Sequence, residues 1–299
     1  MRRKTPIFAR QRRSTGRRVA GWLPLGLVIV LAGSLAAVRA LGEDVALAPD
    51  PGPGHVHALG LDAESQSLFI ATHTGLYRLP PGEARSEPIS DRHQDTMGFT
   101  VAGPGYLLGS GHPDLRDDLP PLLGLIESRD AGETWQPVSL FGEVDFHVLR
   151  ADGRHVVGYD ATSGRILVSM DDGRTWKDQK PPERLRDLVV HPSSRKILVA
   201  AGESRLLISR DGGVTWSSGE RKSGLLAWPR GDRLYLLDPS GRTWMSPDGG
   251  NRWQPRGHLG ATPAAFMAVD THILYAATHD GSIKRSSDGG AIWITRSVR

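Results

Sequence analysis

The chain has 299 residues, of which 36 are glycine, 21 are proline and none is cysteine. The lack of cysteine excludes disulfides, thiolate metal sites and a cysteine nucleophile. The formal net charge is +4, but eight cationic residues and no acidic residue fall within the first 18 positions, so the remainder is mildly acidic. That balance argues against a basic groove, and we expect no nucleic-acid partner.

The N-terminal region joins this basic segment, residues 1–18, to an apolar segment, residues 19–41. About 20 apolar residues can cross a bilayer as a helix. Positive charge ahead of them predicts that the N-terminus stays in the cytoplasm. We expect a single-pass protein of the cell membrane whose C-terminal domain lies outside the cytoplasm. The alternative is a cleaved signal peptide and a secreted protein, with small-residue cleavage sites ending at Ala40 or Ala48. Residues 42–54 then form a proline-rich linker.

Five copies of one short motif organise the rest of the chain. The first is Ser128-Arg-Asp130-Ala-Gly132-Glu-Thr134-Trp135, and successive copies start 41, 40, 37 and 40 residues apart. A period near 40 indicates a repeat array. The aspartate can accept hydrogen bonds from backbone N–H groups of a turn, and the glycine supplies a positive φ. We interpret the motif as a hairpin turn, called a clasp below, with structural residues Asp130, Asp171, Asp211, Asp248, Asp288, Trp135, Trp176, Trp216, Trp253 and Trp293.

The motif and its spacing resemble the Asp-box (BNR) repeat of sialidases, sortilin-like receptors and propellers like the photosystem II assembly factors. The resemblance covers roughly residues 55–299. The strings at residues 95–100, 110–114 and 145–147 also resemble bacterial proteins described as glycosyl hydrolases because of this repeat. The resemblance implies a β-propeller, a fold that hosts enzymes, receptors and scaffolds alike.

Six units of four strands can be laid out over residues 55–299, and a clasp closes every unit except the first. This arrangement predicts an all-β, six-bladed β-propeller, preceded by one N-terminal transmembrane or signal helix. Residues 111–124 form an insertion in the second unit, and we expect a functional loop there. Ring closure requires that either the linker or the strand at residues 293–299 pair across the junction of the last and first units.

Polar residues gather on one face in this arrangement. In a propeller the first strand of each blade lines the central channel, and its start shares a face with the turn between the second and third strands. The candidate metal ligands on this face are His55, His57, His73, Met97, His112 and His147, with Asp114, Arg186 and His279 as further binding-face residues. A His/Met/Asp set without cysteine suits copper or another transition metal. The alternative is a polar channel whose histidines bind only water.

Three functions remain open. The first is a binding or assembly scaffold whose His-rich face holds a metal and whose partner is a protein or a glycan. The second is a glycoside hydrolase that uses Asp95, Asp145 and Asp160 on the same face, since such enzymes need two carboxylates. Tyr159 is the one candidate for a sialidase-like nucleophile, but the Arg-Ile-Pro signature of sialidases is missing. The third is a protein-docking propeller without a small-molecule site.

Overall fold

A computed structural model describes residues 54–298 of the chain. The expected membrane or signal segment and nearly all of the linker lie outside these residues. Between residues 54 and 298 we find no helix with the length and apolar character needed to cross a bilayer.

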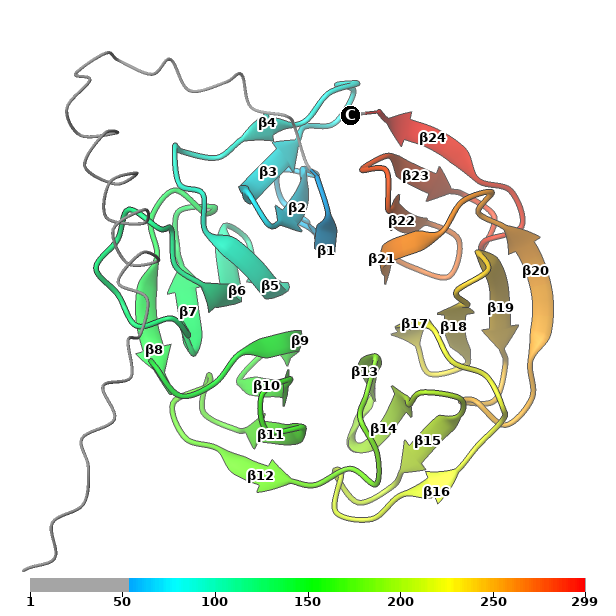
Figure 1. Ribbon diagram of the computed structural model, residues 1–299. Helices are drawn as coiled ribbons and strands as arrows, with labels where there is room; N and C mark the ends of the chain where they lie inside the picture. The colour runs from blue at the N-terminus through cyan, green and yellow to red at the C-terminus, as the bar shows by residue number, and fades with distance from the viewer. Residues whose placement is uncertain (1–53, 299) are drawn as a thin grey trace, which may run out of the picture. The chain divides into compact units, whose positions relative to one another are not determined.

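The described chain is a ring of six antiparallel sheets, each made of four consecutive strands (Figure 1). This is the expected six-bladed β-propeller. The first strand of each blade faces the centre of the ring. Blade 1 consists of β1 (Val56–Leu61), β2 (Leu68–Thr72), β3 (Gly75–Leu79) and β4 (Glu87–Pro88). Blade 2 consists of β5 (Asp95–Gly103), β6 (Tyr106–His112), β7 (Leu125–Ser128) and β8 (Gln136–Ser139). Blade 3 consists of β9 (Phe146–Asp152), β10 (His155–Asp160), β11 (Arg165–Ser169) and β12 (Lys177–Gln179).

Blades 4 to 6 repeat this plan. Blade 4 consists of β13 (Asp187–His191), β14 (Ser194–Ala201), β15 (Leu206–Ser209) and β16 (Ser217–Ser218). Blade 5 consists of β17 (Leu225–Arg230), β18 (Arg233–Leu237), β19 (Arg242–Ser246) and β20 (Gln254–His258). Blade 6 consists of β21 (Pro263–Ala268), β22 (Leu274–Thr278), β23 (Ile283–Ser286) and β24 (Ile294–Ser297). Because neighbouring strands are antiparallel, the start of each first strand and the turn between the second and third strands share one face, which we call the axial face.

The clasps join the third and fourth strands of blades 2 to 6, on the face opposite the axial face. In the first clasp Ser128 Oγ donates to Asp130 Oδ1 at 2.7 Å and accepts from Gly132 N at 2.8 Å, while Thr134 N donates to Asp130 at 2.9 Å. The other four clasps repeat these bonds. In the first three clasps, hydrogen bonds from the motif threonine lower the pKa of the aspartate to about 2. The motif therefore builds turns.

Each clasp tryptophan packs between its own blade and the preceding one. Trp216 of blade 4, for example, lies against a buried cluster that contains Val157 of blade 3 and Leu188 of blade 4. Its indole N–H donates to Gly213 O at 2.9 Å. Gly132 shows why the turn needs glycine: its φ is +96°, and an added Cβ would lie 2.6 Å from Leu76 Cδ2 in blade 1. The repeat period is thus set by the contact between one blade and the next.

The junction of blades 6 and 1 differs from the other five because blade 1 has no clasp. Val56 and Ile70 pack there against Ile283. Ser297 Oγ donates to Ala84 O at 2.8 Å, and Arg296 Nη2 to Pro80 O at 3.1 Å. A cavity of about 340 Å³ lies at this junction. Of the two alternatives expected for closure, the strand at residues 293–299 does not pair across the junction, because β24 pairs with β23 of its own blade. The other alternative, the linker, lies outside the described residues.

Candidate metal centre and adjoining cleft

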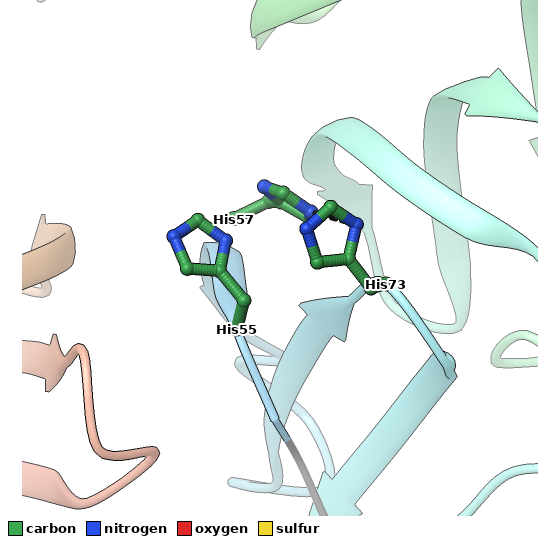
Figure 2. A group of neighbouring side chains, drawn as sticks. All are labelled: His55, His57 and His73. Atoms are coloured by element: carbon green, nitrogen blue, oxygen red, sulfur yellow. Dashed lines mark hydrogen bonds between the residues drawn. The ribbon is translucent and has the colours of Figure 1, made fainter.

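Three histidines converge on the axial face at blade 1. His55 directly precedes β1, His57 is the second residue of β1, and His73 lies in the turn between β2 and β3. Atoms of these three side chains that could bind a metal all lie within 4.8 Å of one another (Figure 2). His57 is 8% exposed in its side chain and His73 is 50% exposed, so the cluster is open to solvent on one side.

Asp95, the first residue of β5 in blade 2, completes this cluster. Its Oδ1 lies 3.0 Å from His73 Nδ1 and 3.3 Å from His57 Nε2, and these two nitrogens lie 3.1 Å apart. An imidazole nitrogen offers either one hydrogen or one lone pair, so the three mutual contacts cannot all be well-formed hydrogen bonds. Ligand atoms at 2.0–2.2 Å from a single transition-metal ion lie roughly 3.0–3.5 Å apart. The triangle therefore has the dimensions of part of a coordination sphere.

The electrostatics of the cluster favour the protonation states that bind metals. Burial lowers the pKa of His55, and the neighbouring His57, His73 and His279 lower it further. Burial raises the pKa of Asp95, but hydrogen bonds from His57 and His73 outweigh it and leave the carboxyl pKa below its ordinary value. Metal ligation requires neutral imidazole and ionised carboxylate, and these pKa directions favour those states at His55 and Asp95.

Blade 6 adds a fourth imidazole to the edge of the cluster. His279 lies in the turn between β22 and β23, and its ring centroid is 5.2 Å from that of His55. Blades 1 and 6 are neighbours once the ring closes, as Figure 1 shows. The closure of the ring thus brings together residues that lie more than 200 positions apart in the sequence.

Two of the remaining candidate ligands, His112 and His147, form a separate group at blades 2 and 3. His147 Nε2 lies 2.9 Å from Asp145 Oδ2, and His112 Nε2 lies 3.7 Å from the same oxygen. His112 Nδ1 donates to Pro121 O at 2.7 Å. Met97 lies on β5 two residues beyond Asp95 and is half-buried. Five of the six predicted ligands are therefore divided between two groups, and the tighter group is the one that contains Asp95.

The other carboxylates of the face are bound to the protein itself. Asp160 accepts hydrogen bonds from Asp145 N, Thr162 N and Ser163 N. Asp114 is buried in the 111–124 insertion. A side-chain hydrogen bond from Arg116 holds the Asp114 pKa well below its usual range. These carboxylates hold turns and the insertion in place.

An open cleft of about 560 Å³ lies beside these groups on the axial face and extends over blades 3 to 6. His147, Arg186 and His279, all expected on the binding face, line it. Arg184 lines it as well and was not expected there. Its alternation with Arg186, two residues apart, was the available sequence signal. Tyr159 also lines the cleft, but its hydroxyl accepts a hydrogen bond from Leu185 N at 3.2 Å.

Fold and site together define a class: a β-propeller with an imidazole cluster at one end of its axis. No protein-family model matches the chain. One curated protein, vacuolar protein sorting/targeting protein 10 of Schizosaccharomyces japonicus, is 39% identical over 67 residues, which are 21% of this chain and 4% of that protein. The match thus spans a small fraction of that much longer relative.

Several solved structures share the fold. A YCF48 protein bound to a D1 peptide is similar with a TM-score of 0.53 and 16% identity, over 82% of this chain and 83% of that one. A chain of a nidogen/laminin complex is similar with a TM-score of 0.62 and 14% identity, over 78% and 93% of the two chains. The GH74 xyloglucanase of Xanthomonas campestris is similar with a TM-score of 0.53 and 18% identity, over 82% and 45%. At these identities the likeness concerns the fold alone.

Proposed function

We propose that the chain is an extracytoplasmic binding scaffold whose axial face holds a transition-metal ion through His55, His57, His73 and Asp95. The observation that carries this proposal is the triangle of His57 Nε2, His73 Nδ1 and Asp95 Oδ1, with sides of 3.0–3.3 Å. Such a nitrogen and oxygen donor set suits copper(II) or zinc. The metal has a structural or recognition role in this proposal.

We extend the proposal to the partner and to the location of the protein. The ligand of the scaffold is a protein, and the propellers solved in a nidogen/laminin complex and with a D1 peptide support this choice of partner. We also propose that the clasps are Asp-box repeats, which their residues and hydrogen bonds support. Residues 19–41 tether the domain to the cell membrane.

Metal analysis of the purified full-length chain tests the metal centre. After treatment with a chelator and then with copper or zinc, about one ion per chain is expected by elemental analysis. The variants His57→Ala and His73→Ala should lose this ion. His258→Ala, which removes an exposed histidine of β20, should retain it. A metal-free wild-type chain, or equal metal content in all variants, would overturn the proposal.

A glycoside hydrolase has less support in the geometry. Asp95 and Asp145 each contact imidazoles, and Asp160 is engaged by its own turn. Turnover of aryl glycosides or sialosides by the wild-type chain, lost in Asp95→Asn and Asp145→Asn, would nevertheless establish this alternative.

A further inference from the structure

The cleft on the axial face is distinct from the metal centre. None of His55, His57 and His73 lines it. Its walls come from loops and strand ends of blades 3 to 6, and they include the apolar side chains of Leu185, Leu225, Leu237, Pro239 and Pro263. Its volume, about 560 Å³, falls within the range of small-ligand sites, which is about 300–1,000 Å³.

The charged groups that line the cleft are all cationic or titrate to a cation. Arg184 and Arg186 are both exposed, and neither guanidinium has a hydrogen-bond or ion-pair partner within residues 54–298. No aspartate or glutamate lines the cleft. The guanidinium donors of both arginines are therefore available to an anion that enters the cleft.

Three acidic residues next to the cleft have other partners in the protein. A fourth, Glu183, precedes Arg184; its Oε1 is buried without a hydrogen-bond partner, and it makes no ion pair with either arginine within residues 54–298. Asp187, which follows Arg186, is buried; it accepts from Arg150 Nη2 at 2.6 Å and from Leu226 N at 2.7 Å. Asp238, between two lining residues, accepts from the backbone and from Trp244 Nε1 at 2.9 Å. Asp145 is bonded to His147. Neither Arg184 nor Arg186 therefore has a carboxylate partner within residues 54–298.

We propose that this cleft binds an organic carboxylate attached to an apolar body. The guanidinium groups of Arg184 and Arg186 hold the carboxylate, since their planar donor geometry matches it. The apolar body lies against the leucine and proline walls. His147 and His279 flank the site and add positive charge when protonated. Two sources share this chemistry, a small carboxylic acid and the carboxyl terminus of an apolar peptide.

Binding measurements with matched acids and amides test this assignment. Isothermal titration of the purified full-length chain, with buffer and detergent as the blank, would compare 3-phenylpropanoate with 3-phenylpropanamide. An apolar tripeptide with a free carboxyl terminus, compared with its amidated form, is the second arm. We expect the acid of at least one pair to bind at least about tenfold more tightly than its amide, because charged hydrogen bonds are lost in the amide. The tighter acid identifies the source.

Variants separate this site from the metal centre. Arg184→Gln combined with Arg186→Gln should weaken acid binding at least about tenfold. Arg230→Gln, at an exposed position outside the cleft, should leave it unchanged. His57→Ala, which removes a proposed metal ligand, should also leave it unchanged, so that failure of one proposal is distinguishable from failure of the other. Equal binding of acids and amides, no binding of either acid, or full binding by the double glutamine variant would overturn the assignment.

Discussion

The two faces of the ring carry opposite kinds of sequence. The clasp face repeats one motif in five blades, with the same serine, aspartate and glycine bonds each time. On the axial face the corresponding positions differ from blade to blade: His57 in blade 1, Met97 in blade 2, His147 in blade 3 and Arg186 in blade 4. Packing between blades demands the same solution at each junction, whereas a binding site needs different groups around one point. Repetition therefore marks structure, and departures from it mark the site.

The largest effect that we predict concerns the clasp face. Trp216→Ala should lower the free energy of unfolding by about 3 kcal/mol, because it removes a large side chain packed between blades 3 and 4. Denaturant unfolding of the metal-free chain measures this loss. Metal content of the folded variant should match that of the wild type. If metal binding fell together with stability, the separation of the two faces would be lost.

A substitution on the axial face should lower metal affinity rather than the stability of the fold. Asp95→Asn removes the negative charge that faces His57 and His73 and should weaken metal affinity about 10- to 100-fold, as changes to groups that ligate or orient ligands do. Competition with a chelator of known affinity measures the change. Asp178→Asn, at an exposed carboxylate on β12, is the matched control. Unchanged affinity in Asp95→Asn would remove this residue from the metal centre.

The pH dependence of the metal-free chain should report on His55. The pKa of His55 is lower in the folded protein than its ordinary value of about 6.5. The unfolded chain therefore takes up a proton first as the pH falls, and stability should decline below about pH 6.5 while it is unaffected by this residue above it. Unfolding measured between pH 8 and 5, compared with His55→Gln, tests this. An identical pH profile in the variant would contradict the prediction.

The smallest effect is expected at the tip of the insertion. Leu115 is fully exposed, and the loop around it is held by Asp114, which accepts from His93 N at 2.8 Å. Leu115→Ser should change the free energy of unfolding by less than about 0.5 kcal/mol. Thermal unfolding provides the measurement. A larger loss of stability would show that Leu115 packs against the protein.

The blade count and the order of the strands could be predicted from the sequence, because the clasp marks the turn between the third and fourth strands of every blade except the first. Ser128 to Trp135 is a local hairpin whose hydrogen bonds join residues two to four positions apart. Because the bonded residues lie so close in the chain, their pattern can be recognised in the sequence. The gathering of His55, His57 and His73 was also expected, because the start of the first strand of a blade shares a face with the turn between its second and third strands.

The detailed geometry of the site was not predictable in the same way. Whether His112 and His147 join the blade 1 histidines depends on a shared contact with Asp145, which is set by side-chain conformation. A binding site on this face was expected, but the apolar walls of the cleft were not, because they combine loops of four blades with no common motif. The contacts at the ring junction were not predictable because side chains of Arg296 and Ser297 hydrogen-bond to backbone carbonyls of blade 1, and no sequence motif marks such bonds.

That junction has a mechanical consequence. Blades 1 and 6 are linked neither by a connecting loop nor, within residues 54–298, by main-chain pairing, and no indole fills the space between them. Among residues 54–298, separating these two blades therefore breaks only contacts made by side chains, beside the place where His279 meets His55. An ion held by the histidines of blade 1 would lie beside this junction. A small separation of blades 1 and 6 would then be coupled to weaker binding of the ion.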